Sequence, residues 1–305
     1  MTADDRRPAR FSRPDDAQRD VARAHRAFPV WRVVLWAVVL LIAANFAWTV
    51  ARNENFGWPV VLRYLFDPIV MQGLGVTLML TVVAMTLGTI LGLPIAIARM
   101  SPDPLASGLA WGFVWFFRGT PLLVQLIFWY NLSTLFPRLS LAIPFGPSLA
   151  AWNTNDIITP LTAAVLGLAL NEAAYMAEII RAGLLSVDRG QVETAEAFGM
   201  GRGRTLRRVV LPQAMRAIVP PTGNQLISML KGTSLVSVIA MADLLYSVQS
   251  IYNRTFEIIP LLLVAVVWYL FLTSILNVVQ SRIERFYGRG HDRENVTADL
   301  PQEAT

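Results

Sequence analysis

The sequence predicts an all-α polytopic membrane protein with about six transmembrane helices. Three observations support this fold class: the composition, the long charge-free stretches and the distribution of arginine. Of the 305 residues, 54% are hydrophobic and only 15% are charged, and the mean hydropathy is +0.48. A soluble domain carries about 25% charged residues, because its surface must be polar. These values indicate that a lipid bilayer surrounds much of this chain.

Six stretches are long and apolar enough to cross a membrane as helices. A helix needs about 20 apolar residues to span the roughly 30 Å hydrocarbon layer. Each stretch holds two charged residues at most, and the six are 31–50, 69–98, 105–136, 157–180, 217–242 and 258–281. Residues 1–28 and 286–305 are polar and poor in apolar residues, so we expect two disordered tails.

The basic residues predict the orientation of these helices, because cytoplasmic loops of membrane proteins are enriched in Lys and Arg. With the N-terminus inside, few of the 26 basic residues fall in outside segments, namely Arg52, Arg63, Arg138 and Arg254. Both termini are therefore expected in the cytoplasm. This distribution also accounts for the net charge of +5 without any binding of nucleic acid.

The residue types exclude several kinds of chemistry. There is no cysteine, and the two histidines, His25 and His291, lie in the polar tails. Disulfides, thiolate or histidine metal sites and cysteine nucleophiles are thus not expected in the body of the chain. A P-loop needs G-x-x-x-x-G-K-[ST], but the single lysine, Lys231, follows Leu230. We therefore expect neither a catalytic site nor ATP binding through a P-loop.

The loop at 186–212 carries strong helix signals. Asp188 is suited to cap a helix start, with Gln191 as the second residue of a capping box. Gly199 is suited to a left-handed helix end, and a second helix is expected from about Arg204 to the residue before Pro212. Between cap and glycine runs an apolar stripe at helical spacing: Val192, Ala195 and Phe198. Such a helix would dock a partner, or lie on the membrane with its arginines against anionic lipid.

This loop resembles the EAA loop of ABC-importer permeases, whose pattern is E-A-A-x3-G-x9-I-x-L-P. The spacing is the same here, and two positions differ: Thr194 replaces the second alanine and Val209 replaces the isoleucine. The matching residues are Glu193, Thr194, Ala195, Gly199, Val209, Leu211 and Pro212. The polar amino-acid branch of that family carries histidine, glutamate, glutamine, arginine and opine permeases. Four further blocks resemble this branch: GLGVTLMLTVVAMTLGTILGLPIAIAR, FFRGTPLLVQL, NEAAYMAEIIRAGL and LKGTSLVSVIA.

The resemblance implies a permease domain over 69–285 in a bacterial cytoplasmic (inner) membrane. The helix at 29–51 is an addition to this domain. The resemblance also implies three partners: a cytoplasmic ATPase dimer, a second permease copy or sister permease, and an extracytoplasmic binding protein that delivers polar amino acids. ATP and Mg²⁺ would bind the ATPase, and this chain would need no cofactor. Closure of the ATPase would move the docked helix at 190–199 and reorient the spans.

A self-contained transporter driven by an ion gradient is the alternative function. Such transporters usually contain two structural repeats. We find neither a repeat nor a set of paired acidic residues that would relay protons. The spacing of the EAA-like loop favours the ABC importer.

Polar residues inside the predicted spans are candidates for the substrate pathway, because charges in a membrane are costly and usually functional. Lys231 would meet a substrate carboxylate, or pair with Glu172 or Glu178. Its span is expected to break near the middle, with Thr233 or Ser234 capping the outer half. The polar candidates on this span are Asn224, Gln225, Lys231, Thr233 and Ser234.

Two other spans contribute candidates. Glu172 and Tyr175 lie three residues apart on one helix face, so both would line a pore. Arg118 precedes a bend expected at Pro121, where it would form a gate or contact substrate, or bind the carbonyl groups that the bend frees. Gly88 and Gly92 form a GxxxG motif that permits close approach of a second helix.

Overall fold

The computed structural model describes residues 30–142 and 148–287. The tail predicted at 1–28 lies outside these residues. Of the tail predicted at 286–305, residues 286 and 287 belong to the last described helix, and the rest lies outside the described residues. The chain divides into two compact units, Met1–Phe56 and Gly57–Thr305. The permease domain predicted at 69–285 lies within the second unit, and its exact boundaries stay a prediction.

The first unit contains α2 (Val30–Arg52) and the short 3-10 helix η1 (Glu54–Phe56). Helix α2 is long and apolar enough to cross a membrane and includes the predicted span at 31–50. Tryptophan and arginine meet at its C-terminal end, where the guanidinium of Arg52 lies 4.1 Å from the ring centroid of Trp48. This pairing suits a membrane–water interface, where aromatic rings and cations are both favoured.

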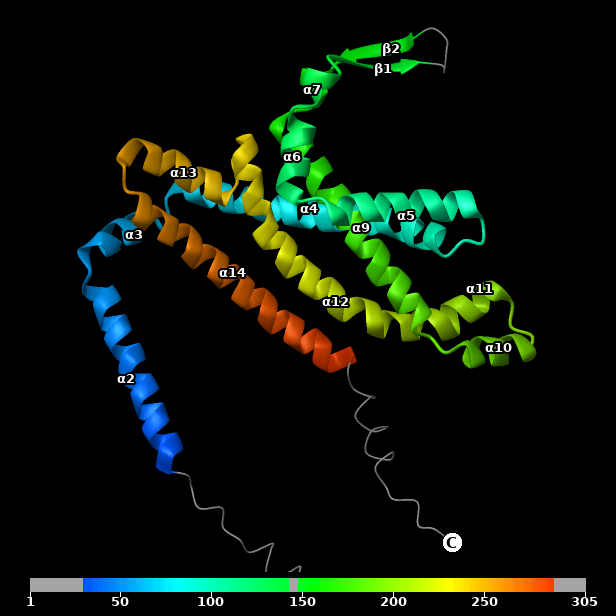
Figure 1. Cartoon of the computed structure of the whole chain (residues 1–305), viewed down its shortest axis with the longest axis horizontal. Coiled ribbons are helices and arrows are strands. Elements are labelled where there is room, and N and C mark those ends of the chain that lie inside the picture. The colour runs from blue at the N-terminus through cyan, green and yellow to red at the C-terminus, as the bar shows by residue number, and fades with distance from the viewer. Residues whose placement is uncertain (1–29, 143–147, 288–305) are drawn as a thin grey trace, which may run out of the picture. The chain divides into compact units, whose positions relative to one another are not determined.

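The second unit is a helical assembly with one β-hairpin (Figure 1). Its elements, in chain order, are α3 (Trp58–Tyr64), α4 (Pro68–Arg99), α5 (Pro104–Gly119), α6 (Leu122–Tyr130), α7 (Leu132–Leu135), β1 (Arg138–Ala142), β2 (Ser148–Asn153), α8 (Thr154–Ile157), α9 (Pro160–Leu185), α10 (Arg189–Ala197), α11 (Arg202–Thr205), the π-helix η2 (Leu206–Val210), α12 (Leu211–Gly232), the 3-10 helix η3 (Thr233–Ile239), α13 (Leu244–Thr255) and α14 (Ile258–Tyr287).

Four described helices are long and apolar enough to cross a membrane on their own: α2, α4, α9 and α14. Two bent pairs also pass the test, namely α5 with α6, bent by 102°, and the helix over 202–239 with α13, bent by 45°. Counting each pair as one span gives up to six. The bend predicted at Pro121 within the span at 105–136 is confirmed, because the chain is extended at Thr120 and Pro121 between α5 and α6.

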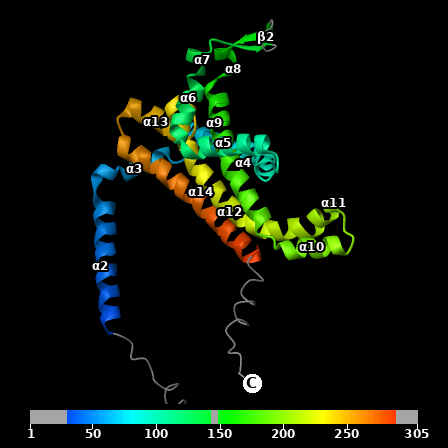
Figure 2. The ribbon, with the colours of Figure 1, turned by 45° about the vertical axis from the view of Figure 1, so that its right-hand side comes forward.

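Helix α4 packs closely on α9 along the predicted GxxxG motif (Figure 2). A Cβ atom added at Gly88 would lie 2.6 Å from Cβ of Glu172, and one at Gly92 would lie 2.9 Å from Cβ of Met176. No side chain fits at either position, so the two glycines set the distance between the helices. The adjoining core joins α4, α6 and α9 through Leu80, Leu126 and Leu168, which are all fully buried.

A β-hairpin that is not predicted from the sequence interrupts the all-α architecture between α7 and α8. Strands β1 and β2 are antiparallel, with Arg138 opposite Asn153 and Leu139 opposite Trp152. The hairpin projects beyond α7 and α8 in both ribbon views (Figures 1 and 2). Two strands of five and six residues carry too little alternating pattern to be separated from a loop by sequence alone.

Candidate functional site

The predicted loop helix exists as α10, and its two ends are fixed by local hydrogen bonds. The Asp188 carboxylate accepts a hydrogen bond from the Gly190 amide at 2.6 Å, which caps the N-terminus. At the other end, Gly199 adopts φ +76°. The Gly199 amide donates to the Glu196 carbonyl and the Met200 amide donates to the Ala195 carbonyl, which together form a Schellman motif. The left-handed turn reverses the chain.

The returning helix, α11 followed by η2, lies beside α10 and forms with it a two-helix hairpin at one end of the second unit (Figures 1 and 2). We call residues 188–210 the coupling hairpin, because the resemblance to the EAA loop implies that this segment couples the permease to an ATPase. The prediction that Gln191 completes a capping box with Asp188 is wrong. The side-chain oxygen of Gln191 instead accepts a hydrogen bond from Gln213 Nε2 at 2.6 Å. This bond joins α10 to the base of α12.

The second helix of the hairpin is predicted to end before Pro212. It instead continues into α12. Proline lacks an amide hydrogen and its ring crowds the carbonyl four residues earlier. The helix makes a π-turn over 206–210, in which the Leu211 amide donates to the Leu206 carbonyl. Such a turn relieves the mismatch that proline creates. Helix α11, η2 and α12 thus form one continuous helical rod.

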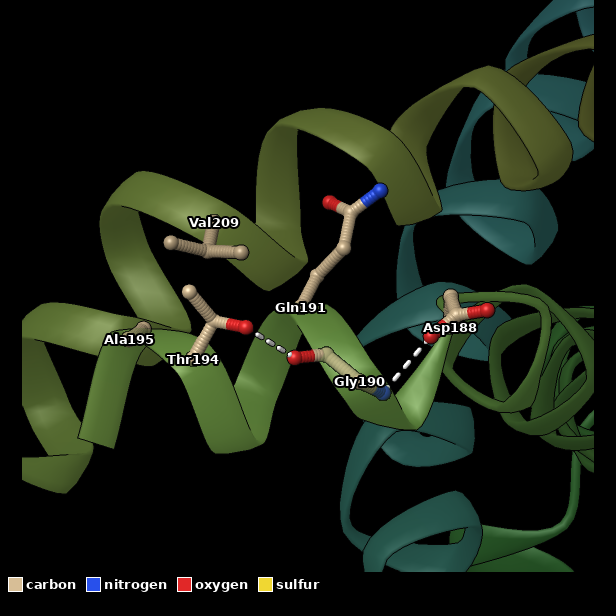
Figure 3. Close-up of a pocket in the computed structure, with 6 residues that line it drawn as sticks. All are labelled: Asp188, Gly190, Gln191, Thr194, Ala195 and Val209. Atoms are coloured by element: carbon tan, nitrogen blue, oxygen red, sulfur yellow. Dashed lines mark hydrogen bonds between the residues drawn. The ribbon is translucent and has the colours of Figure 1, made fainter. Parts of the chain in front are cut away.

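A shallow pocket lies between the two helices of the coupling hairpin, and six residues line it: Asp188, Gly190, Gln191, Thr194, Ala195 and Val209 (Figure 3). Ala195 is buried, and the Thr194 hydroxyl donates to the Gly190 carbonyl at 2.6 Å. The EAA-like residues therefore divide into two groups. Thr194, Ala195 and Val209 face the groove, whereas Glu193, Gly199, Leu211 and Pro212 are exposed.

The predicted apolar stripe of α10 is not buried along its length. Ala195 packs inside the hairpin, Val192 is half-buried, and Phe198 is 84% exposed at the turn. A large aromatic side chain that is exposed beside a rigid turn is unfavourable in water, because its apolar surface stays hydrated. This side chain gives the hairpin an apolar tip.

The bend between α5 and α6 is held by two side chains that the sequence analysis does not single out, Gln125 and Asn171. Gln125 Nε2 donates to the Phe117 carbonyl at 3.0 Å and to the Thr120 carbonyl at 3.1 Å. Asn171 Nδ2 donates to the same Phe117 carbonyl at 2.9 Å. These two amides, and not Arg118, bind the carbonyl groups freed by the bend. Their only signal in the sequence is a polar residue within an otherwise apolar run.

Arg118 contacts a different candidate. Its guanidinium carbon lies 5.1 Å from the ring centroid of Tyr175, a cation–π contact between α5 and α9. Arg118 is exposed and Tyr175 is half-buried. This pair unites two of the predicted substrate-pathway residues at the bend.

Glu172 points into the protein, although Tyr175 lies on the same helix three residues later. Its side chain is fully buried, and its Oε2 accepts a hydrogen bond from Gln225 Nε2 at 2.9 Å. Its Oε1 has no hydrogen-bond partner among the described residues. Gly88 leaves the space that the Glu172 side chain occupies. The bond to Gln225 joins α9 to α12.

Lys231 forms no ion pair with Glu172 or Glu178 in the described part of the chain, so this predicted pairing is wrong. Glu178 instead binds Arg181 at 2.8 Å and Arg99 at 3.4 Å. The side chains of Lys231 and Asn224 are exposed on the surface of the single chain. The rotation of α12 about its axis turns them away from α9, while Gln225 faces it.

The prediction that the fifth span breaks at Thr233 or Ser234 is wrong. Each hydroxyl donates to the carbonyl three residues earlier, and the chain continues through η3 to Ile239. The break comes after Ala240, which has φ +57°. Asp243 then caps α13 by accepting from the amides two and three residues later. The hydroxyls of Thr233 and Ser234 are used within the turn, so neither caps a helix start.

Comparison with known proteins defines the class. Residues 84–289, more than half of the chain, match the family described as binding-protein-dependent transport system inner membrane component. The arginine transport system permease protein of Corynebacterium glutamicum is 44% identical over 85% of this chain and 81% of its own length. The glutamine transport system permease protein of Escherichia coli K12 is 34% identical over 75% of this chain and 94% of its own length.

A solved structure, described as an amino acid ABC transporter with histidines, shares the fold with a TM-score of 0.64. It is 37% identical, and the match covers 75% of this chain and 97% of that one. The chain therefore belongs to the family of binding-protein-dependent transport system inner membrane components. Members of this family are permease subunits whose ATPase is a separate chain, so the alternative of a self-contained secondary transporter is not favoured.

Proposed function

We propose that this chain is the membrane-spanning permease subunit of an ATP-driven importer for polar amino acids. Its relatives include permeases named for arginine and glutamine, both of which are polar. An extracytoplasmic binding protein would deliver the substrate, and a second copy or a sister permease would complete the membrane pathway. ATP and Mg²⁺ would bind to a cytoplasmic ATPase dimer, and both termini of this chain would be cytoplasmic.

The observation that carries this proposal is the coupling hairpin. Its turn is fixed by a Schellman motif, its base is tied to α12 by Gln191 and Gln213, and its tip exposes Phe198. A docking element must move as one body if it is to transmit the closure of an ATPase. The continuous rod from α11 into α12 supplies that connection, because α12 also carries Gln225 against Glu172.

The polar residues at the bend and on α12 support a substrate pathway. Arg118 and Tyr175 meet beside the bend, and Glu172 and Gln225 join α9 to α12. Movement of α12 would change the Glu172–Gln225 contact directly. We therefore assign these four residues to the pathway, together with the candidates that stand elsewhere on the same helical rod: Asn224, Lys231, Thr233 and Ser234.

Two variants test the docking role of the hairpin. Phe198→Ser removes an aromatic ring that is 84% exposed, and Phe256→Ser is the matched control, because Phe256 is 83% exposed after α13. Burying a Phe ring in an interface is worth about 1.5–3 kcal/mol, so the first variant should bind the ATPase about 10- to 100-fold more weakly. Co-purification of the ATPase with each permease variant measures this. Equal retention by both variants would refute the docking role.

Reconstitution tests transport. The permease, its ATPase and its binding protein are placed in liposomes, and uptake of labelled arginine, glutamine and histidine is measured with and without ATP inside. We expect uptake of at least one of them that requires ATP. Uptake by the permease alone under an ion gradient would overturn the proposal.

A further inference from the structure

Basic and apolar side chains share one exposed face of the helical rod that leads from the coupling hairpin into α12. We call this face the arginine–leucine stripe, and it consists of Arg204, Arg207, Arg208, Leu211 and Met215. Arg204 lies three and four residues before Arg207 and Arg208, and Arg207, Leu211 and Met215 follow one another at intervals of four, which is the spacing of neighbours on one side of a helix. Thr205, Ala214 and Ile218 on the same rod are buried. The rod is therefore amphipathic, with the stripe turned outward.

The stripe lies where a membrane helix leaves the hydrocarbon. The helix over 202–239 is part of a candidate span, and at 1.5 Å per residue it is roughly 57 Å long. The hydrocarbon layer is only about 30 Å thick. Because Arg204, Arg207 and Arg208 would be costly inside it, this end of the rod extends into the headgroup region. Leu211 and Met215 follow towards the apolar layer.

The three arginines are arranged to bind an anion. Together with Gly203 they line one hollow, and no acidic residue is part of its lining. Within the described part of the chain, none of the three side chains forms an ion pair or a hydrogen bond. A guanidinium group presents a planar fork of donors that matches two phosphate oxygens. The hollow is thus an electropositive site with unoccupied donors.

We propose that the arginine–leucine stripe binds the headgroup of an anionic phospholipid. The phosphate would lie in the hollow at Arg204, Arg207 and Arg208, and an acyl chain would lie along Leu211 and Met215. The exposed leucine and methionine beside the arginines favour lipid over an acidic protein surface, because an amphipathic lipid satisfies both kinds of side chain. The coupling hairpin then has two roles: α10 docks the ATPase, and α11–η2 holds the membrane surface.

This arrangement would give the coupling hairpin a fixed depth in the membrane. A lipid bound at the base of the rod provides a pivot, so that a push on α10 tilts α12 instead of moving the whole hairpin along the surface. The inference concerns lipid binding and does not depend on which solute is carried.

The test is native mass spectrometry of the full chain with its ATPase, in detergent, with phosphatidylglycerol or phosphatidylcholine added. The variant Arg207→Gln/Arg208→Gln removes two charges from the stripe. The variant Arg282→Gln/Arg285→Gln is the matched control, because it removes the same charge from an exposed helix end on α14. Each arginine near an anionic lipid contributes about fivefold in affinity, so the stripe variant should bind phosphatidylglycerol about 25-fold more weakly. The control should keep most of its affinity.

Several results would overturn the proposal. Equal losses in the two variants would show a diffuse attraction between positive charge and lipid, with no built site. Equal binding of phosphatidylcholine and phosphatidylglycerol would exclude recognition of the anionic headgroup, and displacement of lipid by inorganic phosphate would indicate a site for a free anion. Unchanged lipid binding together with loss of the ATPase from the stripe variant would assign these arginines to the ATPase. None of these readouts requires transport, so a failure of lipid binding is distinguishable from a failure of the proposed transport function.

Discussion

Replacing Gly88 by alanine tests whether the close contact between α4 and α9 holds the membrane core together. A Cβ atom at this position would lie 2.5 Å from Cγ and 2.6 Å from Cβ of Glu172, and 3.2 Å from the Ala173 amide nitrogen. The Cβ and the amide nitrogen belong to or adjoin the backbone of α9, so a side-chain rotation cannot relieve the overlap. The two helices would have to move apart.

Gly75 provides a matched control within α4, because nothing lies within 4 Å of a Cβ atom added there. Both substitutions gain about 1 kcal/mol of helix propensity, since alanine is favoured over glycine. Only Gly88→Ala also suffers overpacking, which costs about 1–3 kcal/mol. The difference between the two variants therefore measures the overpacking alone.

Thermal unfolding in detergent, followed by size-exclusion chromatography, would measure the effect. A change of 1 kcal/mol shifts Tm by about 2–4 °C in a domain of 150–250 residues. Gly88→Ala should therefore unfold several degrees below Gly75→Ala. If the two variants unfold at the same temperature, the contact at Gly88 does not determine the packing of α4 on α9, and the reasoning is refuted.

Two further substitutions test the local structure of the site. Gln125→Leu should destabilise the protein by about 1–3 kcal/mol, because the Thr120 carbonyl at the bend loses its side-chain donor and the Phe117 carbonyl keeps only Asn171; a Tm equal to that of the unmodified chain would contradict this role. Gly199→Ala should loosen the hairpin turn by about 1–2 kcal/mol, since a Cβ atom is disfavoured at φ +76°. Gly203→Ala is its control, because the added Cβ meets nothing within 4 Å. Hydrogen exchange of the hairpin amides should rise in the first variant only.

Features that depend on neighbouring residues could be predicted from the sequence. The apolar stretches predict the membrane helices, and the cap at Asp188 and the left-handed turn at Gly199 are both confirmed. The GxxxG motif likewise identifies Gly88 and Gly92 as a contact surface. The length of a stretch, the identity of a cap and the conformation of a glycine are set within about one helical turn, which is the range that sequence patterns describe.

The partners of the polar membrane residues were decided by the tertiary structure. Asn171 and Gln125 are 46 residues apart, and Glu172 and Gln225 are 53 apart, so no local pattern connects either pair. The choice of Gln225 over Lys231 depends on how α12 is rotated about its axis. Packing against α9 sets that rotation. The sequence thus determined that this chain forms membrane helices and a helical hairpin in the loop at 186–212, while helix packing decided which polar side chains meet inside the helices.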